Sequence, residues 1–194
     1  ALTTAQRTDQ DIAAYLELHV EQGSVLESKQ CQIGVVQGIV SLQRFQVAIT
    51  GRPNHAGTTP MPLRKDALYA ASLLVAAVHD VAVDIPGDQV ATVGLLNVTP
   101  NAPNIVPGRE ELTIDMRDLS LETLGQMIDV LKQRIQAIAA STGTQIELQP
   151  QHFVEPTLAS PVVQAAISTV CADLQLTHYS MPSRAIHDAQ EIGR

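Results

Sequence analysis

The order of strand-like and helix-like segments between residues 43 and 149 restricts the fold of this chain more than any other feature. Strand patterns cover residues 43–50, 90–98, 110–116 and 145–149, and helix patterns cover residues 66–83 and 121–141. The order β-α-β-β-α-β is typical of a ferredoxin-like split βαβ unit, in which both helices cover one face of a four-stranded antiparallel sheet. The predicted fold class is therefore α+β.

Each predicted helix has an apolar stripe with the three- and four-residue spacing of a single buried face. In the first helix the stripe consists of Leu68, Ala71, Val75, Val78 and Val81. In the second it consists of Leu121, Leu124, Ile128, Leu131, Ile135 and Ile138. Gly143 follows the second helix and is predicted to end it, because glycine adopts the left-handed conformation that ends many helices.

The ferredoxin-like unit, placed at residues 42–153, is predicted to be inserted between two flanking segments, residues 1–41 and 154–194. In the first flank, residues 15–22 alternate between apolar and polar side chains, which predicts a strand with one buried face. In the second flank, Ser160 and Pro161 predict the start of a helix, with the serine as its cap. The flanks should pack on each other or on chain outside this sequence.

The amino-acid composition argues against nucleic acids and membranes as partners. The net charge is −8, and no cluster of Lys and Arg could neutralise a run of phosphates, so we expect no nucleic-acid partner. No apolar run is long enough to predict a membrane partner. Cys31 and Cys171 lack the spacing of metal ligands, and two ordinary reduced thiols favour a cytoplasmic location.

Among the histidines, His19 and His55 have the most informative surroundings. His19 lies between Glu17 and Glu21 on the polar face of the predicted strand, where an imidazole can bind zinc and a carboxylate can fix its tautomer. A single histidine is not a metal site, however, and a surface histidine is the simpler interpretation. His55 lies in a loop directly after a strand, where either a functional or a solvated histidine fits.

Three further polar residues are ambiguous when taken singly. Asn104 lies in a tight loop, where asparagine is a common turn residue. Arg117 ends a strand, and a surface ion pair with Asp118 would explain it equally well. His187 precedes an aspartate in a segment that could simply begin a helix.

Together, these residues belong to sequence motifs that resemble one enzyme family. The motifs are HVEQGSVL (residues 19–26), NHAGTTPM (54–61), RKDAL (64–68), TVG (92–94), PNAPNIVP (100–107), TIDMR (113–117) and HDA (187–189). In this order they resemble the N-carbamoyl-L-amino acid hydrolase, β-ureidopropionase and allantoate amidohydrolase family, which is related to dizinc aminoacylases and carboxypeptidases. The resemblance covers nearly the whole chain.

The resemblance implies a dizinc enzyme, with manganese or another divalent metal as an alternative to zinc. His19 would be one of five metal ligands, and the other four are expected upstream of Ala1 and beyond Arg194. Residues 1–41 and 154–194 would then be parts of the zinc-hydrolase domain. Residues 42–153 would be a dimerisation and lid domain, through which the protein forms a homodimer. This chain alone is expected to be inactive.

The resemblance also implies roles around the substrate. Gln22 would lie near the substrate amide, and Asn104 and Arg117 would hold the substrate carboxylate. His55 would be a catalytic residue that reaches the partner subunit's site and stabilises the oxyanion. His187 would line the substrate pocket, although Arg184 and Ile186 stand where relatives usually have glycine.

The implied reaction is hydrolysis of a linear ureido or amide C–N bond by zinc-activated water, with a small carboxylate-bearing substrate such as an N-carbamoyl-L-amino acid or allantoate. Two alternatives remain open. The chain could be a non-catalytic dimerisation or binding module, or part of a dizinc aminoacylase or peptidase. A module needed only for dimerisation would not require His55, Asn104 or Arg117.

Overall fold

The structure, a computed structural model, describes residues 12–193 of the chain. The chain divides into two compact units. The central unit is Ser41–Pro156, and the flanking unit consists of residues 1–40 and 157–194.

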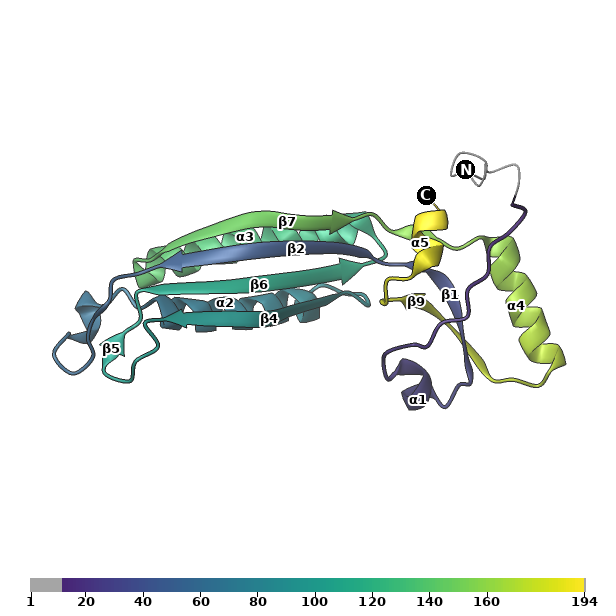
Figure 1. Ribbon diagram of the computed structural model, residues 1–194, viewed down its shortest axis with the longest axis horizontal. Coiled ribbons are helices and arrows are strands. Elements are labelled where there is room, and N and C mark those ends of the chain that lie inside the picture. Colours follow the sequence, from purple (N-terminus) through teal and green to yellow (C-terminus); the bar gives the residue numbers. More distant parts are fainter. Residues whose placement is uncertain (1–11, 194) are drawn as a thin grey trace, which may run out of the picture. The chain divides into compact units, whose positions relative to one another are not determined.

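The central unit has the predicted order of elements, which are β2 (Ser41–Thr50), α2 (Ala67–Asp84), β4 (Val90–Thr99), β6 (Arg109–Asp118), α3 (Leu121–Thr142) and β7 (Gln145–Val154). The four strands form an antiparallel sheet in the order β4-β6-β2-β7. Both helices cover the same face of this sheet (Figure 1). The α+β, ferredoxin-like fold class is therefore confirmed.

Strand β6 shows how the sheet separates its two faces. Its alternate residues Glu110, Leu112, Ile114 and Met116 are fully buried on the side of the helices. The residues between them are partly exposed on the other side and include Asp115 and Arg117. The same alternation in β2 buries Phe45, Val47 and Ile49. The sheet thus has one apolar face in the core and one polar face without a helix, as its period of two residues requires.

The predicted buried face of α2 is partly wrong. Leu68 and Val75 are 36% and 38% exposed, and the buried residues are instead Ala67, Ala70, Ala71, Leu74, Ala77, Val78 and Val81. Because 13 of its 18 residues are Ala, Leu or Val, spacing alone could not select the buried face. The face rich in alanine allows the helix to lie close to the sheet. In α3 the stripe is correct at Leu124, Leu131, Ile135 and Ile138, but Leu121 is 49% exposed.

Both long helices have defined ends. The Asp66 side chain accepts hydrogen bonds from the backbone N–H groups of Leu68 and Tyr69, each at 3.0 Å, and so caps α2. The Ser120 side chain caps α3 by accepting from Thr123 N. Gly143 has a φ of 65° and ends α3 in the left-handed conformation, as predicted.

Helix α2 is long and apolar enough to cross a membrane by length and composition. Seven of its residues nevertheless belong to the core of the central unit and pack against the sheet and α3. Packing within the domain therefore explains its apolar composition.

The flanking unit contains a three-stranded sheet in the order β8-β1-β9. Its elements are α1 (Val25–Lys29), β1 (Ile33–Ile39), β8 (Thr157–Leu158), α4 (Pro161–Asp173), β9 (His178–Ser183) and α5 (Asp188–Ile192). Strand β1 pairs in parallel with β9 and antiparallel with β8. Pro161 begins α4 as predicted, but the side chain of Ser160 makes no capping hydrogen bond.

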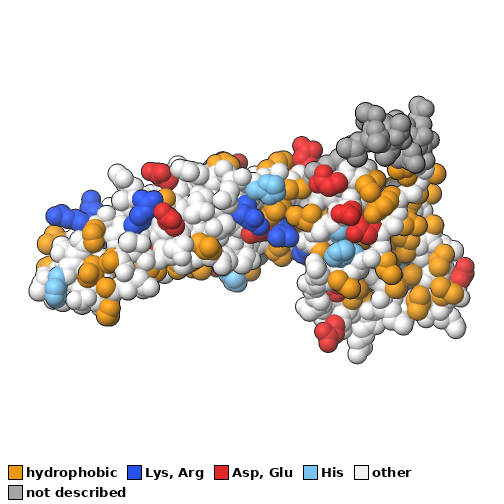
Figure 2. Space-filling view, in the orientation of Figure 1, with side chains coloured by type: hydrophobic (Ala, Val, Ile, Leu, Met, Phe, Trp, Pro, Cys, Tyr) orange, Lys and Arg blue, Asp and Glu red, His pale blue; other side chains and the backbone are white. Residues whose placement is uncertain are grey.

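The strand predicted for residues 15–22 is not formed, and this segment has no regular secondary structure. Its predicted inward side chains Leu16, Leu18 and Val20 are 67%, 97% and 73% exposed. A strand requires a neighbour for its backbone hydrogen bonds, and no described segment pairs with this one. The alternation of apolar and polar residues in this segment therefore does not produce a strand, because no neighbouring strand among the described residues accepts its backbone hydrogen bonds. Apolar side chains are also exposed over the part of this unit that contains α4 (Figure 2).

One core position of the central unit carries a carboxyl group. Glu110 is fully buried, it lies between Ile49 and Val98 in the sheet, and neither of its side-chain oxygens has a hydrogen-bond partner among the described residues. Burial, and secondarily the negative charge of Asp66, raises the pKa of Glu110 from 4.5 to about 7. The folded chain therefore retains a proton that the unfolded chain releases.

This carboxyl should make the stability of the protein depend on pH. Because the pKa of Glu110 is higher in the folded chain than in the unfolded chain, this group contributes fully to the free energy of unfolding below pH 4.5. The contribution is lost as the pH rises from 4.5 to about 7. Glu110→Leu removes the carboxyl, so this variant should lack the loss of stability. The difference in free energy of unfolding between Glu110→Leu and the unmodified protein should therefore be up to about 3 kcal/mol larger, in favour of the variant, at pH 7 than at pH 4.5. Urea unfolding at these two pH values measures the difference. Glu111→Gln, on the opposite face of β6, is the control. An advantage that is equal at both pH values would contradict the assignment.

Candidate active-site residues

The proposed substrate residues of the central unit lie at the two ends of β6. Arg117 is near the C-terminal end of this strand and faces Leu42 and Val90 on the neighbouring strands. Arg109 begins the strand and faces Thr50 and Thr99. The loops that carry His55 and Asn104 connect to the Arg109 end.

At the Arg109 end, two short strands join these loops. Strand β3 (Asn54–His55) pairs antiparallel with β5 (Ile105–Val106), and Ala56 N donates to the carbonyl oxygen of Asn104 at 2.9 Å. The structure therefore brings His55 and Asn104 onto one loop pair, and both residues are exposed. The close approach of the chain here also requires Gly51, because a Cβ atom at that position would collide with the carbonyl oxygen of Lys65.

The hydrogen bonds of His55 determine its tautomer. Gly57 N lies 3.0 Å from His55 Nδ1, and a backbone N–H can only donate, so Nδ1 accepts and the proton of the neutral ring is on Nε2. Arg64 holds the same loop by donating from Nε to Thr59 O at 3.0 Å and from Nη2 to Ala56 O at 2.5 Å. His55 is thus a fixed hydrogen-bond donor at Nε2 on an exposed loop.

At the other end of β6, an aspartate fixes Arg117. Arg117 Nε and Nη2 donate to the two carboxylate oxygens of Asp115, at 2.7 and 3.2 Å, and Arg44 Nη2 donates to Asp115 at 2.9 Å. Burial tends to raise the pKa of Asp115, but hydrogen bonds and charges of Arg117 and Arg44 outweigh it, and the pKa lies below its usual value. Asp118, considered above as the partner of Arg117, instead accepts from Ser120 N.

Arg117 and Asn104, which the family resemblance assigns to the same substrate carboxylate, are not brought together within one chain. Arg117 lies eight positions after Arg109 in β6, which corresponds to about 27 Å along an antiparallel strand. Asn104 connects to the Arg109 end. One carboxylate therefore cannot contact both residues of the same chain.

In the flanking unit, the structure brings His19 and His187 together. Their rings stack with centroids 5.0 Å apart and an interplanar angle of 25°. Glu17 Oε2 lies 3.2 Å from His187 Nδ1 and accepts from Ala189 N at 2.8 Å. His187 Nε2 lies 3.2 Å from Ser183 Oγ, and the His187 side chain is only 8% exposed.

The neighbouring groups also act on Glu17. The backbone N–H of Ala189, followed by the hydrogen bond and the charge of His187, outweighs the effect of burial and keeps the pKa of Glu17 below its usual value. The bulkier residues of this loop do not displace His187 from the cluster. Ile186 points its apolar side chain partly into solvent and is 45% exposed.

Gln22 lies in an exposed turn that its neighbour holds. Its φ is 55°, a left-handed conformation that is uncommon for a residue other than glycine. Glu21 accepts hydrogen bonds from Val25 N at 2.7 Å and Leu26 N at 2.9 Å, and so ties this turn to the start of α1. Gln22 therefore lies in a turn that Glu21 holds against the start of α1, three positions after His19.

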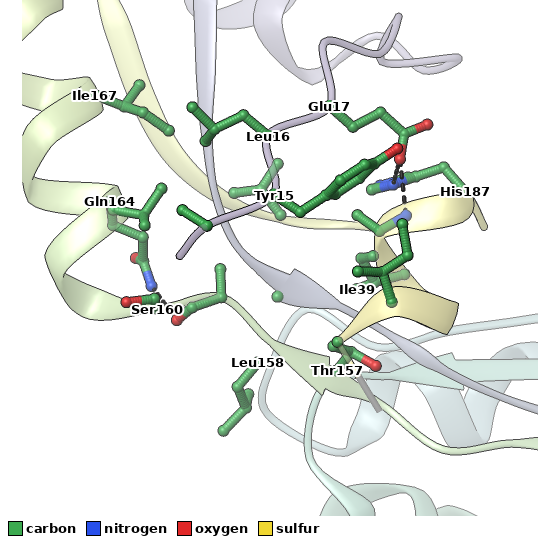
Figure 3. A pocket seen from close by; sticks show the side chains of 18 of the residues that line it. Tyr15, Leu16, Glu17, Ile39, Thr157, Leu158, Ser160, Gln164, Ile167 and His187 are labelled. Carbon is green, nitrogen blue, oxygen red and sulfur yellow. Dashed lines mark hydrogen bonds and ion pairs between the residues drawn. The ribbon is translucent and has the colours of Figure 1, made fainter. Parts of the chain in front are cut away.

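The flanking unit has a pocket of about 700 Å³ between the segment 12–17, α4 and the β1–β8 strands (Figure 3). Glu17 and His187 lie side by side in its wall, and most of the other lining is apolar or backbone. His19 and Gln22 do not line it. This pocket therefore contains one of the proposed substrate residues and is not by itself the predicted site.

Among the described residues, His19 is the one ligand that we assign to the metal implied by the family resemblance. His19 Nδ1 lies 2.7 Å from the carbonyl oxygen of Val20 and donates to it, which leaves the Nε2 lone pair for a metal. No group of three or more His, Cys, Asp or Glu side chains in residues 12–193 is arranged to hold a metal ion. The described residues therefore do not form a metal site by themselves.

Two residues of these clusters were missed by the sequence analysis. Asp115 precedes Arg117 by two positions, so both side chains lie on one face of a strand, and this spacing was a usable signal. Glu17 was considered only as a neighbour of His19. Its contact with His187, 170 positions away, has no signal in the sequence pattern.

Comparisons with known proteins agree with these motifs. Residues 38–143 match the family described as "Peptidase dimerisation domain". The chain is 38% identical to an N-carbamoyl-L-amino-acid amidohydrolase of Paenarthrobacter aurescens, over 100% of this chain and 47% of that protein. It is 37% identical to the allantoate amidohydrolase of Escherichia coli (strain K12), over 93% of this chain and 44% of that protein.

A solved structure shows the same likeness. The chain superposes on an amidase of the hydantoinase/carbamoylase family from Burkholderia multivorans with a TM-score of 0.88 and 34% identity, covering 90% of this chain and 43% of that one. The chain thus spans less than half the length of the relatives it matches. It belongs to the peptidase dimerisation-domain family, and its relatives include N-carbamoyl-L-amino-acid and allantoate amidohydrolases.

Proposed function

We propose that the whole protein hydrolyses a linear amide or ureido C–N bond in a small substrate that carries a carboxylate. An N-carbamoyl-L-amino acid or allantoate would be such a substrate. The names of the relatives support the type of reaction. The observation that carries the proposal is the orientation of Arg117 by Asp115 on the polar face of a rigid sheet.

Arg117 is suited to anchor the substrate carboxylate. A guanidinium stays charged at any relevant pH and presents planar donors that match a carboxylate. Because Asp115 engages the Nε–Nη2 edge, the plane of the group is set before the substrate binds. Arg44 pairs with the same aspartate, which fixes the carboxylate that orients Arg117.

His55 and Asn104 are suited to act on the same substrate from another subunit. His55 presents a fixed N–H donor, which could stabilise the oxyanion formed at the attacked carbonyl. Asn104 lies beside it and offers an amide donor. Since about 27 Å of β6 separates this pair from Arg117 in one chain, a shared site needs Arg117 from one subunit and the loop pair from its partner.

The edge of the sheet supports a homodimer of this kind. Strand β4 is an edge strand, and its Val90, Leu95 and Leu96 are 38%, 47% and 41% exposed. The adjoining helix α2 leaves Tyr69 and Val75 exposed as well. An unpaired edge with apolar neighbours favours pairing with a second copy.

We further propose a dependence on divalent metal, with zinc as the first candidate and manganese as the alternative. Such ions, when bound, lower the pKa of water for attack on the carbonyl. From this chain we assign only His19 as a ligand, and Gln22 and His187 as residues that would lie near the substrate. The protein would act in the cytoplasm.

Two other functions would leave different traces. A non-catalytic dimerisation module would need neither Arg117 nor a donor at His55. Substitution of either residue would then leave the dimer intact, and no hydrolytic activity would be found to change. An aminoacylase or peptidase would act on acyl amides in preference to ureido substrates. A panel of N-carbamoyl amino acids, allantoate and N-acyl amino acids, tested with the whole protein, separates these functions.

Arg117→Ala in the whole protein should lower kcat/KM about 10- to 150-fold, because a hydrogen bond to a charged group contributes about 1.5–3 kcal/mol. Arg117→Lys should recover little, since an ammonium cannot copy the planar fork. Steady-state kinetics on metal-loaded protein measure both effects. Arg134→Ala is the matched control, because Arg134 is about as exposed as Arg117 and pairs with Asp84 at 2.7 Å. Near-normal kcat/KM for Arg117→Ala would contradict the anchor.

A substrate variant sharpens this test. Converting the substrate carboxylate to a neutral amide should lower kcat/KM of the unmodified protein by a similar factor. In Arg117→Ala the same conversion should have little further effect, because the two changes remove one interaction. Additive losses would show that Arg117 acts elsewhere.

The 194-residue chain by itself should retain no stoichiometric zinc, because its described residues offer one ligand and a catalytic zinc needs about three. Metal analysis after dialysis measures the zinc content. Two zinc ions per chain would contradict the assignment of His19 as a single ligand.

A further inference from the structure

We infer that Glu17 is a positioning residue, which holds His187 and through it the place of His19. The inference rests on the proposed function, because it concerns two residues that we place at that site. Glu17 itself is not assigned a contact with substrate or metal.

The carboxylate of Glu17 joins two segments that lie far apart in the sequence. Its Oε2 accepts from the Ala189 backbone at 2.8 Å, and lies 3.2 Å from His187 Nδ1 (Figure 3). An ionised carboxylate can only accept, so this contact places a proton on Nδ1 of His187. Glu17 therefore determines both the position and the tautomer of this ring.

His187 is held at its other nitrogen as well. Ser183 Oγ lies 3.2 Å from Nε2, and because Nε2 of a neutral ring protonated at Nδ1 can only accept, the serine hydroxyl donates to it. With both nitrogens engaged and the side chain 8% exposed, the ring has one orientation. The stacked ring of His19, 5.0 Å away, is then placed against a fixed surface.

The surrounding segment explains why one carboxylate has this influence. Residues 12–24 have no regular secondary structure, and Leu16 and Leu18 are mostly exposed, so neither backbone pairing nor apolar packing of these side chains fixes the chain here. The side-chain contacts on either side of His19 are those of Glu17 and Glu21. Glu21 ties the segment to α1, and Glu17 ties it to the loop that carries His187.

A purely structural role would be the capping of α5 through Ala189. The tautomer of His187 separates the two roles, because capping of α5 does not determine it. Glu17→Gln keeps an amide oxygen that can accept from both N–H groups, whereas Glu17→Ala removes both contacts. Glu27→Ala, an exposed glutamate in α1, is the control.

The test uses nitrogen-15 NMR of the imidazole rings in the 194-residue chain, with His187 assigned from the spectrum of His187→Asn. In the unmodified chain and in Glu27→Ala, Nδ1 of His187 should be protonated. In Glu17→Ala this signal should move to the unprotonated range, and Glu17→Gln should retain the original tautomer. A His187 ring signal unchanged in Glu17→Ala would overturn the inference. Loss of the tautomer in both Glu17 variants alike would also overturn it, because hydrogen-bond geometry would then not be the cause.

Kinetics of the whole protein supply the second arm. Glu17→Ala should lower kcat/KM about tenfold or more, Glu17→Gln should recover most of this loss, and the double variant Glu17→Ala/His187→Ala should be no worse than His187→Ala alone. Additive losses would overturn the inference. If the whole protein showed no amidohydrolase activity, the proposed function would fail while the NMR arm still decided the role of Glu17.

Discussion

The length and stiffness of β6 determine how far apart the candidate site residues of one chain lie. The strand lies inside a four-stranded sheet, paired with β2 and β4 along its length, and cannot bend to bring its ends together. It carries Arg117 at one end and adjoins the loop pair of His55 and Asn104 at the other, about 27 Å away. If these residues serve one small substrate, the site must be divided between two chains. Dimerisation would then be a requirement of catalysis as well as of assembly.

Local hydrogen bonds prepare each proposed site residue before any substrate arrives. Asp115 sets the plane of the Arg117 guanidinium, a backbone N–H of Gly57 selects the tautomer of His55, and Glu17 orients His187. In each case the partner is a group that can only accept or only donate, so it fixes the orientation of the guanidinium and the tautomers of the two histidine rings. Such fixed donors stabilise charge without reorganisation during the reaction.

The fold of the central unit could be predicted from sequence because its strands and helices have distinct periods and find their partners within the chain. Residues 15–22 show the limit of such patterns. Their alternation is that of a strand, yet Leu18 is 97% exposed because no described segment pairs with them. The buried face of α2 could not be predicted from spacing, because Ala, Leu and Val make up 13 of its 18 residues. The candidate site residues came from motifs, which identify residues but not distances. The separation of Asn104 from Arg117 and the contact of Glu17 with His187 needed the three-dimensional structure.

Subunit complementation tests the divided site most directly. His55→Ala and Arg117→Ala, each made in the whole protein, should both be nearly inactive. If the two are unfolded and refolded together, half of the dimers should be mixed, and each mixed dimer should contain one intact site built from the unaltered His55 of one chain and the unaltered Arg117 of the other. Activity should therefore return to about a quarter of that of the unmodified protein. Activity of the mixture that merely equals the average of the two separate variants would show that His55 and Arg117 do not share a site across subunits.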